Sequence, residues 1–474
     1  MLTRTLLLTC LVLTAGCILH KPQPIEPIVP VPESFLEDND ITYSDYPIEK
    51  WWEMFDDEKL NELMDEAFTN NLDITVAFAR LEQLKAITRA TSAPQKPFLD
   101  AEGKIMRESS PSFFGDYTGN SYRLSLLAGY EVDVWEKYKS QIKAAVLETE
   151  ATHEDIKALY MSLSAQLVDL YYLAVEQREQ LRLTDNTIAS FEDALKRVEL
   201  RYRQGLTPTL DVYQAQQNLA RARAGRPVFE ANLVVTEHAL ATLLGRYPDC
   251  GTSGDLAVIS EIPDAFPAGI PSEMLARRPD IHAAFLRVKA SDEWIATAIA
   301  ERFPAFNLIG SYGKSSTAFV TGDIVGVFWN VILSAAQPIF DGGRRSAEVD
   351  RTRAVFKENL ALYHKAVLTA FQEVEDALAR NRFSEEHIAL LKRQVESSAN
   401  ALRVSLFRYT EGLIDYLPVI AAQQNLYESE SALISARRQL ISDRIQLARA
   451  LGGEWMDEYI NKRIMADNKE QKRQ

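Results

Sequence analysis

Histidine and cysteine are the side chains that most often bind metals or act as nucleophiles, and the chain has six histidines and three cysteines. The histidines are scattered along the sequence, at His20, His153, His238, His282, His364 and His387. None forms a His-x-x-x-His pair or lies beside a cysteine at the spacing of a zinc site. We therefore expect no metal site.

Motifs for phosphate binding and nucleophilic catalysis are also missing. The sequence has no Gly-x-x-x-x-Gly-Lys-Ser/Thr loop, no Gly-x-Ser-x-Gly elbow and no Gly-x-Gly-x-x-Gly fingerprint. Asp341-Gly342-Gly343 could form a phosphate nest, but at the end of a predicted strand it is expected to be a turn. The net charge of -15 argues against a nucleic-acid partner. We expect no enzyme activity, no cofactor and no nucleic-acid partner.

Cys17 follows a short secretory signal. Arg4 is followed by an apolar run from Leu6 to Leu13 and then by Ala15-Gly16, immediately before the cysteine. The apolar run is too short to span a bilayer. Residues 1–16 are therefore predicted to be a signal peptide, with residues 17–50 a Pro-rich N-terminal segment.

The same segment resembles a bacterial lipoprotein signal, in which the cysteine becomes the first mature residue and is acylated. That resemblance implies lipid attachment at Cys17, and Ile18 in place of aspartate implies sorting to the outer membrane. Thr14 stands where leucine is usual, so the alternative is an ordinary signal peptide cleaved nearby. An acylated Cys17 would leave Cys250 without a partner in the mature chain, so the fold is not expected to depend on disulfides.

The chain contains one long sequence twice. RYRQGLTPTLDVYQAQQNL begins at Arg201 and RYTEGLIDYLPVIAAQQNL begins at Arg408, so the offset is 408 minus 201, or 207 residues. The same offset pairs Leu244-Gly245 with Leu451-Gly452. A period of this length indicates a duplicated half-molecule rather than a short-repeat solenoid. We expect one repeat at 51–255, a linker at 256–270, a second repeat at 271–460 and a polar tail at 461–474.

Each repeat contains a long helical stretch, predicted at about 140–245 and 347–452 and broken near its middle by the duplicated motif. Apolar residues recur with a period near 3.5, which is typical of coiled-coil packing. In each motif a glycine ends the first helix, and a proline follows that cannot continue it. The motifs are therefore expected to be the turns of two helix hairpins.

Each helical stretch is preceded by two predicted strands. The ranges are about 98–107 and 121–134 in the first repeat, and 305–313 and 328–340 in the second. Apolar and polar residues alternate along these strands, and the strand lengths suit a membrane barrel. No stretch beyond the signal offers the uninterrupted apolar run of about 20 residues that a transmembrane helix needs. The alternative is an edge hairpin in a soluble α+β domain. Four strands cannot close a barrel, so copies would have to pool them, and periodicity does not choose between two and three copies.

Taken together, these features resemble the TolC-like outer-membrane efflux proteins, in particular the lipid-anchored NodT-type outer membrane factors. The residues that carry the resemblance are Trp51-Trp52, Phe55, Asp57, Leu60 and Leu63, Asn71-Leu72-Asp73, Glu131-Val132-Asp133-Val134-Trp135, Arg278-Pro279-Asp280-Ile281, Pro338-Ile339-Phe340-Asp341-Gly342-Gly343-Arg344 and both duplicated motifs. The resemblance implies a membrane α+β fold: a homotrimeric outer-membrane barrel of twelve strands, four per protomer, continued by a periplasmic coiled-coil barrel with an equatorial region. One departure is Glu136, where the family usually has glycine.

The resemblance also implies a function and a set of site residues. The channel would be a passive duct that docks on a periplasmic adaptor and an inner-membrane pump. The turns would contact the adaptor through Gly205, Leu206, Thr207, Gly412, Leu413 and Ile414. Side chains expected to constrict the closed tunnel are Asp211, Tyr409, Asp415, Tyr416 and Leu417. The family's constriction aspartate falls here on Ala421, so Asp415 is the substitute, and the second turn is expected to line the constriction.

Three alternatives remain at this point. One is the outer-membrane duct of a type I protein secretion system, and another is a structural coiled-coil lipoprotein of the envelope. The third is a soluble periplasmic enzyme, for which no catalytic constellation is present. The exported substrate is not indicated by any residue.

Overall fold

The computed structural model describes residues 20–25, 32, 35–36, 50–112, 115–256, 259, 262, 271–319 and 322–471. The chain forms two compact units, each made of three stretches. Unit 1 comprises Met1–Ile28, Ala79–Glu154 and Ile281–Ala366, and unit 2 comprises Val29–Phe78, Asp155–Asp280 and Val367–Gln474. The predicted signal peptide, Cys17 and most of the predicted linker lie outside the described residues.

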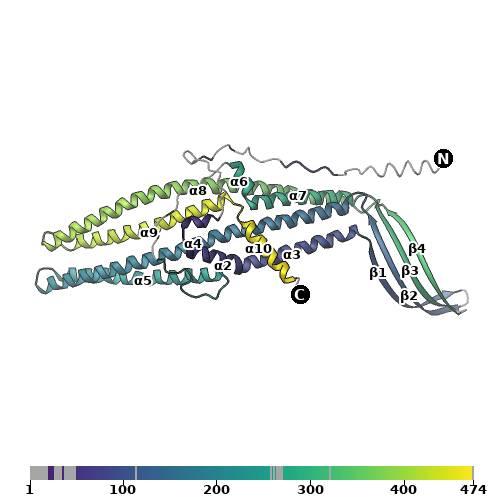
Figure 1. The fold of residues 1–474 in the computed structure, drawn as a ribbon, viewed down its shortest axis with the longest axis horizontal. Helices are drawn as coiled ribbons and strands as arrows, with labels where there is room; N and C mark the ends of the chain where they lie inside the picture. The colour runs from purple at the N-terminus through teal and green to yellow at the C-terminus, as the bar shows by residue number, and fades with distance from the viewer. Residues whose placement is uncertain are drawn as a thin grey trace. The chain divides into compact units, whose positions relative to one another are not determined.

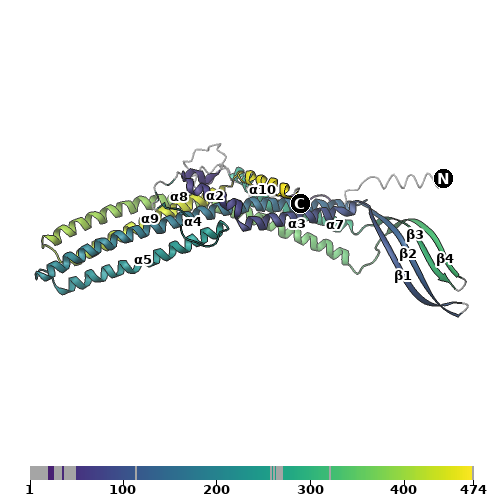
Figure 2. The same cartoon turned by 60° about the horizontal axis from the view of Figure 1, so that its bottom comes forward.

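Unit 1 contains one antiparallel sheet, in the order β1-β2-β3-β4 (Figures 1 and 2). The strands are β1 (Phe98–Ser112), β2 (Gly115–Val132), β3 (Ala305–Phe319) and β4 (Gly322–Ala336). Each hairpin extends further toward its turn than the alternating pattern predicts, whereas β2 and β4 end at Val132 and Ala336, before the predicted ends at 134 and 340. The reason for the extension is that backbone hydrogen bonds continue through polar pairs such as Ser109 opposite Thr118, where no apolar side chain marks the strand.

The two faces of the sheet differ in polarity. From Val325 to Leu333 of β4, the side chains of one face are all apolar and 56% to 75% exposed, at Val325, Val327, Trp329, Val331 and Leu333, whereas Asp323 lies on the same face near the start of the strand. The pairing register places Tyr312 of β3 beside Trp329 on that face, while Asn330 lies on the other. An exposed apolar face of this extent marks a surface that water does not cover in the working molecule. Lipid is the solvent that fits it.

Both edges of the sheet are open among the described strands. β1 pairs only with β2, and β4 pairs only with β3. Unpaired edge strands present rows of free backbone donors and acceptors that pair readily with another chain. Closing this sheet into a barrel therefore requires strands from further copies of the chain.

The helices repeat in length as the sequence does. The helices α4 (Lys137–Arg203) and α8 (Arg344–Thr410) have 67 residues each, and α5 (Thr209–Leu243) and α9 (Leu417–Leu451) have 35 each. In Figure 2, α5 runs back along α4 and α9 along α8, which gives the two expected hairpins. The shorter helical elements are η1 (Trp51–Phe55), α2 (Glu58–Asn70), α3 (Leu72–Ser92), η2 (Ala93–Gln95), α6 (Pro271–Arg277), α7 (Pro279–Ala300) and α10 (Met456–Gln471).

The duplication extends to single hydrogen bonds in unit 2. The Asn71 side-chain amide donates to the carbonyl of Leu243 at 2.8 Å. Adding 207 to both numbers gives Arg278 and Ala450, and the Arg278 guanidinium donates to the Ala450 carbonyl at 3.2 Å. The two halves therefore fasten the start of a short helix to the end of a hairpin in the same way, with different side chains.

An ion pair is duplicated with its charges exchanged. Arg178 of α4 lies 2.5 Å from the carboxylate of Glu237 of α5. The positions 207 residues later are Glu385 of α8 and Arg444 of α9, which also form an ion pair. Opposite charges at equivalent positions show that the two hairpins pack in the same register.

Aromatic side chains form a packed cluster in unit 2. Trp52 is 2% exposed, and its ring lies 4.7 Å from that of Trp455, which also stacks on Phe68. The C-terminal region, predicted to be a polar tail from residue 461, instead continues as helix α10. It is held there because Tyr459 donates a hydrogen bond to Asp65 and the guanidinium of Arg463 lies over the Phe78 ring.

One described helix, α4, contains an 18-residue window apolar enough to cross a membrane by length and composition, although the sequence shows no uninterrupted apolar run. In the folded chain 61% of that window is buried inside the protein. The window is therefore weak evidence for a spanning helix, because a core helix has the same composition.

Candidate functional site

The two hairpin turns have the same backbone. At the end of α4 the amide of Gly205 donates to the carbonyl of Tyr202, and the amide of Leu206 donates to the carbonyl of Arg201, both at 2.9 Å. The end of α8 repeats this pattern from Gly412 and Leu413. These bonds form a Schellman motif, which requires a left-handed residue at the glycine. Gly205 has φ of 71° and Gly412 has φ of 76°, which explains why both repeats keep glycine there.

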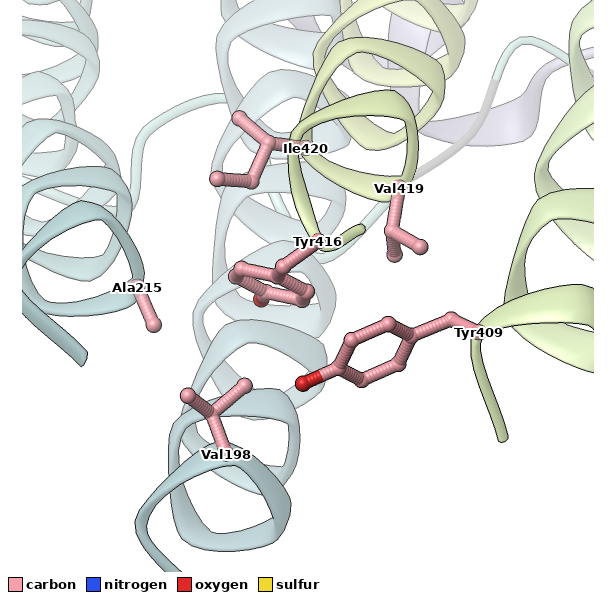
Figure 3. Close-up of a cluster of buried hydrophobic side chains, with 6 residues drawn as sticks. All are labelled: Val198, Ala215, Tyr409, Tyr416, Val419 and Ile420. Atoms are coloured by element: carbon pink, nitrogen blue, oxygen red, sulfur yellow. The ribbon is translucent and has the colours of Figure 1, made fainter. Parts of the chain in front are cut away.

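A cluster of buried side chains joins the two hairpins beside these turns (Figure 3). Its members come from all four long helices and the residue before α9: Val198, Ala215, Tyr409, Tyr416, Val419 and Ile420. The rings of Tyr409 and Tyr416 lie 5.1 Å apart, tilted by 48°, within the range favoured by aromatic pairs. The cluster fixes the second turn to the first hairpin within one chain.

The two turns are not equivalent in their packing. Tyr409 is 6% exposed, whereas Tyr202, its counterpart in the first repeat, is 45% exposed. Ile420 is 6% exposed, whereas its counterpart Tyr213 is 66% exposed. Positions that face the cluster in the second hairpin therefore face outward in the first.

The predicted constriction residues fall into two groups. Tyr409 and Tyr416 lie in the buried cluster, and Asp211 is also buried, where it accepts a hydrogen bond from the Thr207 hydroxyl. Asp415 and Leu417 are exposed at the second turn. Only these last two present their side chains to the space beyond the chain, so the structure does not bring all five residues together on one surface.

The buried tyrosines have distinct surroundings. Burial, together with the nearby Tyr409 and Asp211, raises the pKa of the Tyr416 hydroxyl to about 12. Tyr416 is therefore neutral at ordinary pH. The Tyr409 hydroxyl is buried with no hydrogen-bond partner among the described residues. Its ring is covered instead by the Arg201 guanidinium, 4.8 Å from the ring centroid.

The predicted turn residues are mainly at the surface. Leu206 is 62% exposed and Leu413 is 66% exposed, next to the exposed glycines. Thr207 and Ile414 are half-buried, because Thr207 donates to Asp211 and Ile414 packs against the cluster.

Sequence reasoning missed the contacts that hold the hairpins together. Arg201 donates to the carbonyl of Thr410 at 3.2 Å, and Gln424 donates to the side chain of Asn218 at 2.9 Å. Arg201 and Gln424 belong to the duplicated motif. The duplication of the motif pointed to these residues, but repetition alone cannot say in which of the two motifs a given residue makes a contact.

The junction between sheet and helix in unit 1 carries the unusual Glu136. This residue adopts φ of 58°, the left-handed conformation for which glycine is the usual choice. The turn stays short because Asp133 caps α4, accepting from the amides of Tyr138 at 3.1 Å and Lys139 at 2.9 Å. Glu136 also pairs with Lys139 at 2.7 Å. The departure from glycine is therefore accommodated without a longer turn.

Within the described part of the chain, no group of three or more His, Cys, Asp or Glu side chains is arranged to hold a metal ion. Cys250 is a free, exposed thiol. The geometry that the chain does supply is a lipid-compatible sheet and a pair of packed helix hairpins.

Comparison with known proteins agrees with this geometry. A family model described as outer membrane efflux protein matches residues 63–246 and 270–453. The chain is similar to the solvent efflux pump outer membrane protein SrpC of Pseudomonas putida, with 28% identity over 414 residues that cover 85% of this chain and 87% of the relative. It is also similar to the probable outer membrane lipoprotein SilC of Salmonella typhimurium, with 27% identity over 462 residues, or 96% and 99% of the two chains.

Among solved structures, that of the outer-membrane channel OprN is similar to this chain with a TM-score of 0.84 and 27% sequence identity. The alignment covers 93% of this chain and 100% of the OprN chain.

Proposed function

The chain belongs to the outer membrane efflux protein family, and on this premise we propose that three copies form one passive channel whose periplasmic end is closed by the helix-hairpin turns. The chain is the outer-membrane component of an efflux system. The observation that carries the proposal is the four-stranded sheet with one apolar exposed face and two open edges.

Three copies are proposed because twelve strands would close a barrel with a water-filled interior, whereas the eight strands of two copies would close a barrel whose interior side chains fill. Four strands are too few, since membrane barrels begin at about eight. The lipid-facing side would be the face that carries Trp329 and Val331. The opposite face carries Asn330, which accepts a hydrogen bond from Ser311 and would line the lumen.

The partners are proposed from the family and from the turns. A periplasmic adaptor would contact the exposed leucines, Leu206 and Leu413, and an inner-membrane pump would supply the energy. Acylated Cys17 would anchor the N-terminus in the outer membrane. The family consists of efflux channels, and we propose that this chain carries out no catalysis.

The constriction is proposed to be formed by Asp415 and Leu417 at the second turn. Both side chains are exposed, and three copies would bring three carboxylates into one narrow ring, where they would attract cations. The constriction would also depend on three buried residues that hold the second turn in place, namely Tyr409, Tyr416 and Asp211.

The relatives compared above include one named for solvent efflux, which favours export of small solutes over secretion of polypeptides. The natural substrate is not specified by any contact in the chain.

Single-channel recording in planar bilayers tests the proposal. Asp415→Ala should change the closed-state current or its cation preference, whereas Glu411→Ala, at an exposed carboxylate just before Gly412, should not. A purified protein that is monomeric and forms no channels would refute the channel itself. Channels that do not respond to Asp415→Ala would refute only the constriction.

A further inference from the structure

The apolar face of the sheet carries a lysine among apolar side chains. Lys314 of β3 pairs with Leu124 of β2 on one side and with Val327 of β4 on the other. Directly paired residues point to the same face of a sheet, so the lysine shares the apolar face with both neighbours. Leu124 is 67% exposed and Val327 is 63% exposed, and Lys314 is exposed between them. Its ammonium group has no ion-pair or hydrogen-bond partner among the described residues.

A second cation occupies the equivalent position in the first repeat. Adding 207 to 107 gives 314, so Arg107 of β1 corresponds to Lys314. Gly103 of β1 pairs with Leu124 and belongs to the same row as the lysine. Arg107 is four positions further along and therefore points to the same face. It is exposed, and its guanidinium also has no partner in the part of the chain that the structure describes.

Both cations lie near the height at which a strand leaves the apolar part of a membrane. Each is nine residues from the end of its strand that adjoins the helices, since 107 minus 98 and 314 minus 305 are both 9. At ~3.3 Å per residue and a tilt of about 40°, nine residues rise ~23 Å, compared with ~25 Å for the apolar band of an outer-membrane barrel. In the proposed channel the helices are periplasmic, so this height is that of the headgroups of the outer leaflet.

A hollow of about 420 Å³ in the sheet surface adjoins Lys314. Gly103 provides part of this space because it has no side chain. The other residues of the apolar face that line the hollow are Ile105, Tyr122, Leu124, Ser316 and Val325. A mainly apolar hollow with a cation at its rim suits a ligand that has an acyl chain and an anionic headgroup.

An acidic side chain on the same face lies too far along the sheet to neutralise Lys314. Asp323 of β4 is four residues from Val327, the partner of Lys314, which corresponds to ~13 Å along the strand. The ammonium group is therefore available to an external anion.

We propose that Lys314 and Arg107 bind phosphate groups of the phosphorylated glycolipid that forms the outer leaflet of bacterial outer membranes, with one of its acyl chains in the hollow beside Lys314. The proposal rests on the proposed channel, which sets the orientation of the sheet in the membrane. Lysine and arginine donate charge-assisted hydrogen bonds to phosphate oxygens, and an acyl chain matches the apolar hollow. Three copies would present six such cations, one from each repeat of each copy.

Native mass spectrometry of delipidated trimers in detergent tests the site by counting bound lipids. The probes are bisphosphorylated lipid A, lipid A without its phosphates, and phosphatidylglycerol. Wild-type trimers should bind the first probe several-fold more tightly than either of the others. The double variant Lys314→Gln with Arg107→Gln should lose this preference. The double variant Lys314→Arg with Arg107→Lys, which keeps both charges, should retain it.

The matched control is Lys104→Gln. Lys104 follows Gly103 on the same strand and is also exposed, but it points to the opposite face, so its loss should leave lipid A binding unchanged. Wild-type trimers that bind all three probes equally, or a glutamine double variant that keeps the preference, would overturn the glycolipid site and leave the proposed channel intact. A wild-type protein that is monomeric and forms no channels would overturn both.

Discussion

Two glycines with positive φ differ in what requires glycine at their positions. Gly412 has a left-handed backbone, but a methyl group added there would meet no described atom within 4 Å. Gly452, at the end of α9, has φ of 81°, and its added methyl would lie 2.8 Å from the carbonyl oxygen of Arg277. Conformation alone requires glycine at the first position, whereas conformation and space both require it at the second.

Alanine substitution should separate these two requirements. We expect Gly412→Ala to lower the free energy of unfolding by about 1 to 2 kcal/mol, the cost of a left-handed non-glycine residue. Gly452→Ala should cost a further ~1 to 3 kcal/mol through the clash with Arg277. Thermal melting followed by far-ultraviolet circular dichroism measures both, and equal losses would contradict the role assigned to the carbonyl contact.

At the scale of elements, each strand has two chemically different sides within a single run of residues. Val331 belongs to the exposed apolar face, and the preceding Asn330 lies on the opposite face beside Ser311. Side chains alternate along a strand, so neighbouring positions face different solvents. In the proposed barrel these solvents are lipid and lumen water.

Arginine placed at these neighbouring positions should give opposite results. Val331→Arg should destabilise the inserted barrel by about 2 to 4 kcal/mol, because a charge on the lipid face is costly near the membrane centre. Asn330→Arg should assemble almost normally. Heat-modifiable migration of outer-membrane fractions on a gel reports assembly, and equal behaviour of the two variants would rule out the assignment of the faces.

Across the whole molecule, the two halves have the same arrangement of helices but different side chains at equivalent positions. The buried Arg178–Glu237 pair and the Glu385–Arg444 pair occupy equivalent places with exchanged charges. Glu237 also accepts hydrogen bonds from the amide and hydroxyl of Ser253, at 3.0 and 2.5 Å. The Arg178–Glu237 pair therefore holds together the first hairpin and also anchors the segment around Ser253 that follows it.

Exchanging the charges of the first pair should be partly tolerated. Arg178→Ala should cost about 3 to 5 kcal/mol, because it leaves a buried carboxylate without its partner. The double variant Arg178→Glu with Glu237→Arg should recover part of this loss but not the contacts to Ser253. Arg223→Ala, which removes an exposed ion pair with Glu192, should cost less than about 1 kcal/mol in the same melting experiment. No recovery in the double variant would argue against equivalent packing of the two hairpins.

The sequence by itself determined the duplication, the four alternating strands and the two helix turns, and through resemblance it identified the family and its fold. These features depend on local rules: a glycine at a left-handed turn, a proline that cannot continue a helix, and the periods of strand and helix. Strand lengths and the helix at 456–471 were missed because polar residues pair and pack without a hydrophobic pattern.

Only the tertiary structure decided which member of each duplicated pair is covered. Tyr202 and Tyr409 occupy the same place in the motif, yet Tyr202 is exposed and Tyr409 is buried. The same holds for Phe383 and Glu176, which share a helix position and differ in what lies against them. Burial depends on which neighbour packs against a face, and two halves with the same pattern acquire different neighbours only once the chain is folded.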